Sequence, residues 1–139
     1  MTRAELENLV RAGQIRAEAF DQGEFDGLLR SGRARLRDAR SHRLSLESRF
    51  DLAYNGVHAL ALAALRRRGY RAANRQIVFQ ALPLTLGVAT SVWRVLAKCH
   101  GLRNAAEYEG ALDIDDRLVL ALIAAADAVD AALTGKDAD

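Results

Sequence analysis

The sequence predicts an all-α protein, an up-and-down bundle of five to six helices around a four-helix core. Alanine, leucine and arginine, all strong helix formers, dominate its 139 residues. Pro83 is the one proline, so long stretches contain no helix breaker. Runs rich in valine, isoleucine and threonine, which a sheet would favour, are absent. Half of the residues are hydrophobic and 27% are charged. This length and composition predict one globular domain spanning residues 1–139.

Two helices are expected in the first third of the chain. The first should run from about residue 3 to 20, because apolar residues recur there at helical spacing. The second should run from about residue 24 to 40. The segment Ser41-His42-Arg43 then forms a turn, in which we expect His42 to be exposed.

The third helix has the clearest signals. It should begin after Ser45, a favourable cap residue, and continue to about Arg68. Gly69 ends it, with arginines in the last turn facing the negative end of the helix dipole. A broad apolar stripe at helical spacing predicts a buried face, formed by Leu46, Phe50, Ala53, Tyr54, Val57, Leu60, Ala61, Ala64 and Leu65.

Three further helices are expected after a loop over residues 70–74. A short one over residues 76–82 stops before Pro83. A long one covers residues 84–109, is closed by Gly110, and places Trp93 in the core. The last covers residues 113–133. Short connections favour antiparallel neighbours, which gives the bundle its up-and-down character.

The sequence also favours a cytoplasmic protein without a membrane span. The first five residues lack the apolar run of a signal peptide. The most apolar stretch, residues 118–133, is short and is interrupted by Asp127 and Asp130. Cys99 is the one cysteine, which excludes an intrachain disulfide, fits a reducing compartment and is expected in the core.

Charge is unevenly distributed although the net charge is only +2. Residues 1–75 carry 15 arginines and 9 acidic residues, whereas residues 76–139 carry 5 basic and 9 acidic ones. Such a basic half can attract a polyanion such as RNA. The alternative is an ordinary solvated helix face whose arginines pair with nearby acids. The basic residues cluster at Arg30, Arg33, Arg35, Arg37, Arg40 and Arg43, and again at Arg66, Arg67, Arg68, Arg71 and Arg75.

A first candidate binding strip lies on the third helix. Asp51, Asn55 and His58 are four and three residues apart, so they share one helix face. We expect such a strip to line a cleft and contact a ligand. The alternative is a solvent-exposed strip, or a set of hydrogen bonds between helices that fixes their packing.

A second candidate site lies late on the long helix, at residues 100–110. Arg103 offers a fixed fork of donors suited to a phosphate. Asn104 offers an amide that can hold a sugar or phosphate oxygen, and Tyr108 a phenol and a stacking surface. Glu107 is one turn beyond Arg103 and could simply pair with it.

The segment Arg103-Asn104-x-x-x-Tyr108 resembles the signature of the HEPN superfamily, an arginine, usually a polar residue, and a histidine four to six residues beyond the arginine. The segment from Arg49 to Asn55, followed by Gly69-Tyr70-Arg71, also resembles bacterial HEPN proteins of toxin–antitoxin and related defence operons. The resemblance implies a four-helix core, frequent dimerisation and, in many members, metal-independent endoribonuclease activity. Other members bind RNA, nucleotides or a partner nucleotidyltransferase without catalysis.

The sequence departs from this signature at its histidine, where Tyr108 stands. A tyrosine with a pKa near 10 is poorly suited to accept the 2′-hydroxyl proton at neutral pH. His100, three residues before Arg103, could substitute, as could His58 from a facing helix. The catalytic candidates are therefore Arg103, Asn104, Tyr108 and His100.

Two functions of different kinds remain open. The first is a HEPN-like module that handles RNA or nucleotide, as an active ribonuclease or an inactive binder, in a homodimer, beside an antitoxin or nucleotidyltransferase partner. The second is a non-catalytic interaction or dimerisation protein. No cofactor is expected, and no metal, because clusters of ligand residues at metal-binding spacing are missing.

Overall fold

The computed structural model describes residues 2–110 and 113–135, except the side chains of Thr2, Tyr108 and Glu109. It confirms the all-α class. In the described residues there are seven helices, rather than the five or six expected, and one two-stranded sheet. The elements in chain order are α1 (Thr2–Arg11), β1 (Ile15–Ala17), α2 (Gln22–Ala39), α3 (Leu46–Arg67), β2 (Tyr70–Ala72), α4 (Arg75–Gln80), α5 (Leu82–Thr85), α6 (Thr90–Glu109) and α7 (Asp116–Gly135).

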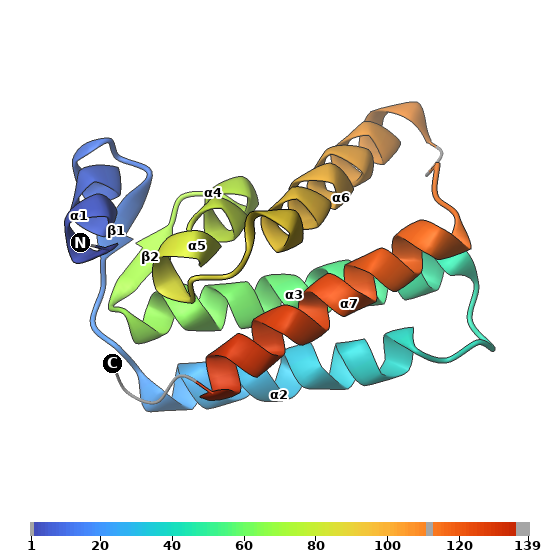
Figure 1. Cartoon of the computed structure of the whole chain (residues 1–139), viewed down its shortest axis with the longest axis horizontal. Helices are drawn as coiled ribbons and strands as arrows, with labels where there is room; N and C mark the ends of the chain where they lie inside the picture. Colours follow the sequence, from blue (N-terminus) through green and yellow to red (C-terminus); the bar gives the residue numbers. More distant parts are fainter. Residues whose placement is uncertain (1, 111–112, 136–139) are drawn as a thin grey trace.

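Helix α3 is the centre of the bundle. Helices α2 and α7 lie alongside it over most of its length, while α4, α5 and α6 cover another of its faces (Figure 1). The expected apolar stripe of α3 is buried except for Leu46, which is half-buried. Ser45 caps the helix through its side chain, which accepts a hydrogen bond from the Ser48 backbone amide at 3.1 Å. Its end was also predicted correctly, because Gly69 turns the chain at a positive φ of 89°.

The contact between α2 and α3 depends on two glycines. A Cβ atom on Gly32 would lie 2.9 Å from the backbone oxygen of Gly56, and a Cβ on Gly56 would lie 3.0 Å from that of Gly32. Neither distance leaves room for a methyl group. The two helices therefore approach backbone to backbone at this point, and Leu36 and Leu60 pack on either side of it.

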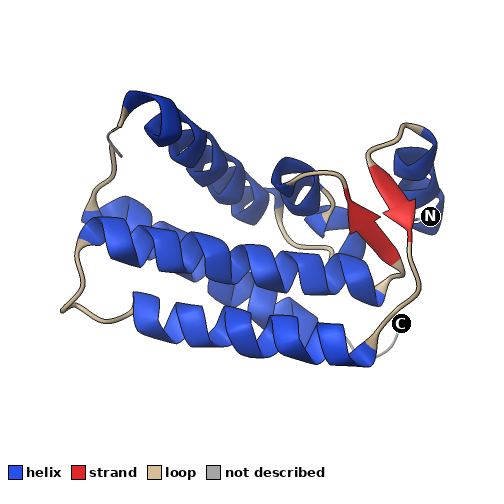
Figure 2. Ribbon diagram, turned by 180° about the vertical axis from the view of Figure 1, so that it is seen from behind, coloured by secondary structure: helices blue, strands red, loops and turns tan. Residues whose placement is uncertain are grey.

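The first predicted helix was wrong beyond residue 11. Helix α1 ends at Arg11, Gly13 takes a positive φ of 76°, and the chain then enters β1. Strand β1 pairs antiparallel with β2, with Ile15 opposite Ala72 and Ala17 opposite Tyr70 (Figure 2). The expected loop over residues 70–74 is thus partly a strand, which buries Ile15 and Tyr70 in a small second core.

Arg66 joins this N-terminal part to the bundle. Its guanidinium is buried, bonds to the Glu24 carboxylate at 2.7 Å, and donates to the backbone oxygens of Glu18 and Ala19 at 2.9 and 2.6 Å. Arg71 closes the network by pairing with Glu18 at 2.8 Å and with Glu24 at 2.5 Å. Hydrogen bonds from Arg71, followed by contributions from Arg66, hold the pKa of the Glu24 and Glu18 carboxyls below their ordinary values.

Two later helices start elsewhere than predicted. The expected helix over 76–82 is two helices, α4 and α5, and Pro83 lies in the first turn of α5, where its missing N–H costs nothing. The expected helix over 84–109 begins only at Thr90, because Gly87 has a positive φ of 68° and interrupts the chain before it. Gly110 closes α6 as expected, in the left-handed conformation.

Helix α7 begins at Asp116 and carries the apolar stripe that was expected of the last helix. Among the described helices it is the one whose length and apolar composition would suffice for a membrane crossing. In the bundle the buried residues of this helix pack against α3 and α6. Its buried residues are Val119, Leu122, Ile123, Ala125, Ala126, Val129 and Leu133.

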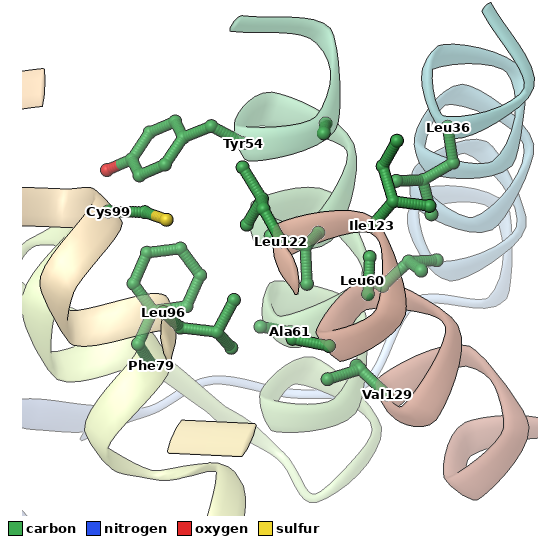
Figure 3. Packing of buried hydrophobic residues seen from close by; sticks show 14 of the residues in the cluster. Leu36, Tyr54, Leu60, Ala61, Phe79, Leu96, Cys99, Leu122, Ile123 and Val129 are labelled. Atoms are coloured by element: carbon green, nitrogen blue, oxygen red, sulfur yellow. The ribbon is translucent and has the colours of Figure 1, made fainter. Parts of the chain in front are cut away.

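The main core lies between α3, α6 and α7 and contains Leu60, Leu96 and Leu122 (Figure 3). Cys99 is fully buried there, as predicted. Trp93 was expected in the core, but it is only half-buried, because the structure places it at the surface where α6 faces α4. This surface belongs to the site described below.

The glycine contact gives a direct test of the packing. We expect Gly32→Ala to lower the free energy of unfolding by about 1–3 kcal/mol, because its methyl group would push against the backbone of α3. Gly101→Ala is the matched control, since nothing lies within 4 Å of the added atom in the exposed middle of α6. The control should be stabilised by about 0.5–1 kcal/mol. Urea unfolding followed by circular dichroism measures both, and equal effects would contradict the proposed contact.

Candidate functional site

The candidate site is built around the ring of Tyr54, which projects from α3 toward α6 (Figure 3). The ring is fully buried, stacks on Phe50 and meets Phe79 of α4 edge-on at 5.7 Å between centroids. Its hydroxyl lies 2.8 Å from Nδ1 of His100 on α6. Burial raises the pKa of Tyr54, so the phenol stays protonated at neutral pH.

Two guanidinium groups lie against this ring. The Cζ atom of Arg103 is 5.0 Å from the ring centroid, and that of Arg75 is 5.6 Å from it. Both distances are typical of cation–π contacts. They also place the two guanidinium carbons within about 11 Å of each other. One buried phenol ring therefore contacts two positively charged groups, one from α4 and one from α6.

Arg75 is held by a neutral group. Its Nη1 donates to Oδ1 of Asn55 at 2.9 Å, and the Asn55 amide nitrogen donates to the backbone oxygen of Asp51, also at 2.9 Å. In the part of the chain that the structure describes, Arg75 makes no ion pair with a carboxylate. Its half-buried positive charge is thus left without an acidic partner, which favours an anionic ligand.

The other arginines of the same cluster serve the fold instead. Arg66 and Arg71 pair with Glu18 and Glu24, as described above. Arg67 donates to the backbone oxygen of Leu133, and Arg68 to that of Thr85. On α2, Arg33 pairs with Asp130 and Arg40 with Asp127, both across to α7. Many arginines of the basic half thus pair with acids or backbone carbonyls. This fits the alternative in which these arginines pair with neighbouring groups of the protein rather than attract a polyanion.

His100 connects the buried ring to the surface. Its Nε2 lies 3.1 Å from the amide nitrogen of Asn104, which can only donate. Nδ1 and the Tyr54 hydroxyl share one hydrogen bond, whose donor is Nδ1 or the hydroxyl according to the tautomer of the ring. In the tautomer with its hydrogen on Nδ1, Nε2 carries the lone pair. Burial, followed by the charges of Arg103 and Arg75, lowers the pKa of His100 and favours this neutral form.

His58 lies one turn beyond Tyr54 on the same face of α3. Its ring meets Phe79 edge-on at 5.8 Å between centroids. Burial lowers the pKa of His58 to about 4, with further contributions from Arg75, Arg103 and His100. Both histidines of the cluster are therefore neutral at pH 7, and the two arginines supply its positive charge.

A groove of about 320 Å³ opens beside Arg103, between α3 and the end of α6. Its floor includes Phe50 and its walls carry three carboxylates, those of Glu47, Asp51 and Glu107. Arg103 pairs with Glu107 at 3.3 Å, the simple pairing that the spacing allowed. These acids would repel a phosphate inside the groove, so the side of Arg75 and His100 is the more favourable one for an anion.

The structure brings several of the predicted residues together and separates others. Arg103, Asn104 and His100 share one cluster on α6, to which Asn55 is connected through Arg75. Asp51 faces the acidic groove through an exposed side chain, whereas His58 is mostly buried. The predicted role of Tyr108 falls on a side chain that lies outside the described residues.

Sequence reasoning missed Tyr54 and Arg75 as site residues. Tyr54 was assigned to the apolar stripe, and Arg75 was counted only as one of a run of charges. The nearest arginine before His100 is Arg94, six residues earlier in the sequence. That arginine is exposed, and six residues place it about 120° from His100 around α6. It therefore does not join the cluster.

Metal binding has no support within residues 2–110 and 113–135. No group of three or more histidine, cysteine, aspartate or glutamate side chains is arranged there to hold a metal ion. The three carboxylates around the groove are thus spread along its walls rather than gathered at one point.

Comparisons of the chain with protein-family models, with curated proteins and with solved structures find no match. The resemblance to the HEPN superfamily, which rests on Arg103-Asn104-x-x-x-Tyr108, on the segment from Arg49 to Asn55 and on Gly69-Tyr70-Arg71, stays a prediction.

The depressed pKa of His58 predicts how stability depends on pH. The folded state holds the ring neutral down to about pH 4, whereas the ordinary pKa of histidine is 6.5. The contribution of His58 is therefore complete above pH 6.5 and is lost as pH falls to about 4, by about 3 kcal/mol in total. We expect His58→Phe to lose less stability than the wild type between pH 7 and 5 in urea unfolding. His42→Gln, at an exposed turn, should keep the wild-type dependence; identical profiles for all three would refute the assignment.

Proposed function

We propose that the protein is a HEPN-like, RNA-handling module of a bacterial toxin–antitoxin or related defence system, which binds an RNA phosphate between Arg75 and Arg103. The observation that carries this proposal is the pair of guanidinium groups on one buried tyrosine beside a neutral histidine. Two arginines can share the charge of a phosphodiester. The absence of a carboxylate partner for Arg75 among the described residues supports an anionic ligand at this place.

The same cluster supports metal-independent cleavage of the RNA. Nε2 of His100 accepts the proton of the 2′-hydroxyl once a substrate displaces the Asn104 amide. The 2′-oxygen then bonds to the phosphorus, and the bond from phosphorus to the 5′-oxygen breaks. The products are a 2′,3′-cyclic phosphate and a 5′-hydroxyl. The leaving 5′-oxygen takes a proton from solvent, and His100 gives the proton from the 2′-hydroxyl back to solvent. The two arginines offset the charge that develops on the phosphoryl oxygens.

Tyr54 is a positioning residue in this scheme. It accepts the Nδ1 hydrogen of His100 at 2.8 Å, which fixes the tautomer that leaves Nε2 basic. When His100 gains a proton on Nε2, the bond to Tyr54 persists. The low pKa of His100, caused first by burial, matches a base that must be neutral when the substrate arrives.

The alternative, a non-catalytic interaction or dimerisation protein, is favoured by two other surfaces. Leu120 on α7 is 57% exposed, the highest of the exposed large hydrophobic residues described. The groove between α3 and α6 has an apolar floor and acidic walls. A second copy, an antitoxin or a nucleotidyltransferase could cover either surface, in which case Arg103 would only pair with Glu107.

Binding of RNA gives the first test of the proposal. We expect Arg75→Gln to weaken binding of a single-stranded RNA by about tenfold, because the variant keeps a donor for Asn55 but loses the charge. Arg37→Gln on the exposed face of α2 is the control of equal charge change. Fluorescence anisotropy at fixed salt measures the affinity of both variants. An equal loss of affinity in the two would mean that only the net charge of the protein matters, and would contradict a site at Arg75.

Cleavage gives the second test. The wild type should convert RNA to products with a 2′,3′-cyclic phosphate end in the presence of EDTA. His100→Ala should lower the rate by about 10²–10⁴-fold, the usual contribution of a general base. Tyr54→Phe should lower it less and shift its pH profile, whereas His42→Gln should leave it unchanged. If the wild type binds RNA tightly but leaves it intact, the catalytic version of the proposal is excluded and the module is a non-catalytic RNA binder.

A further inference from the structure

A slot between α4 and α6 adjoins the proposed phosphate site and has no role in it so far. It has a volume of about 80 Å³. Its walls come from two facing helices, α4 and α6, and one of its residues is His100 itself. The six residues around it are Gln76, Phe79, Gln80, Trp93, Ala97 and His100.

The slot exists because of the residue order on α6. Trp93, Ala97 and His100 are four and three residues apart, so they share the helix face that meets α4. The small side chain of Ala97 leaves a gap between the two larger rings. Phe79, which is buried and meets the His100 ring edge-on at 6.3 Å between centroids, forms the bottom of the gap.

The lining combines aromatic rings with amides. Trp93 and His100 offer ring surfaces of the kind on which unstacked RNA bases lie. Gln76 and Gln80 follow on consecutive turns of α4, and both are exposed. Each amide is both donor and acceptor, so the pair can match the mixed donor and acceptor pattern at the edge of a base.

Size and position narrow the choice of ligand. The slot has about half the volume of a 150 Å³ cavity that takes up benzene, so it admits the edge of one six-membered ring. A purine, with its two fused rings, would leave more of its surface outside the slot than a pyrimidine would. Since His100 belongs both to the slot and to the cluster of Arg75 and Arg103, a base held here would be joined to a phosphate held there.

We propose that this slot is a subsite for one unstacked pyrimidine base of a single-stranded RNA, next to the phosphate bound by Arg75 and Arg103. The inference rests on the proposed function for the position of the phosphate. Trp93 stacks on the base, Gln76 and Gln80 contact its polar edge, and Ala97 provides the space. The protein thus prefers uridine or cytidine at the nucleotide beside the bound phosphate.

The test uses Trp93, the one tryptophan of the chain, as a fluorescent reporter inside the slot. Titration with UMP or CMP should change its emission and give a dissociation constant about tenfold lower than AMP gives. Ala97→Leu fills the gap from an exposed helix position and should weaken UMP binding about tenfold. Ala124→Leu, at an exposed position of α7, is the matched control and should bind as the wild type does.

Further variants separate the slot from the phosphate site. Inorganic phosphate, followed by calorimetry, should bind to wild type and Ala97→Leu equally, but weakly to Arg75→Gln. Uridine, which lacks a phosphate, should respond to Ala97→Leu and Gln80→Ala but not to Arg75→Gln. Equal binding of UMP and AMP, or a full response of Ala97→Leu to UMP with native circular dichroism, overturns the base subsite. If the wild type does not bind inorganic phosphate at all, the proposed function is overturned instead. The uridine titration then still tests the base subsite by itself.

Discussion

The backbone contact between Gly32 and Gly56 is the constraint on which the arrangement of this bundle depends. Since neither residue carries a side chain, α2 can approach α3 closely, and a Cβ on either would clash with the other's carbonyl. At this point α2 covers α3 directly, with no large side chain between the two backbones. Helix α7 then fits against the same pair through its own small and branched residues, such as Ala126 and Val129. The three helices form one tight layer, and α3 has little exposed surface left.

The close contact on one side of α3 explains the polar interior on the other. Tyr54 and His58 lie two residues before and after Gly56, about 200° away around the helix. They therefore point away from α2 and into the space between α3, α4 and α6. A phenol and an imidazole buried there need partners or a neutral state. Tyr54 finds His100, whereas His58 stays neutral because burial lowers its pKa to about 4.

The sequence was sufficient to predict those features that depend on residues within a single helix or turn. The cap at Ser45, the turn at Gly69, the stripe of α3 and the end of α6 at Gly110 all follow from local residue types. Prediction from the sequence failed for features that depend on contacts between segments far apart in the chain. Ile15–Ala17 and Tyr70–Ala72 form strands only because each provides the other's hydrogen-bond partners, and neither has a strand-like composition by itself. The network around Arg66 depends on acids more than forty positions away, which no local pattern links to it.

The site shows the same division between local and distant information. Helical spacing correctly grouped His100, Arg103 and Asn104, which lie within one turn or so of each other. It could not assign Arg75, because nothing local distinguishes that arginine from Arg66 or Arg71. The distinction is electrostatic: acids from the start of the chain neutralise those two, whereas Arg75 donates to the neutral amide of Asn55 and lies against the Tyr54 ring. Arg75 therefore differs from Arg66 and Arg71 in the groups it pairs with, and only the folded chain fixes that pairing. Because the Tyr54 ring, which also belongs to the core, contacts the guanidinium groups of both Arg75 and Arg103, an anion bound there would offset their positive charge and stabilise the fold at the same time.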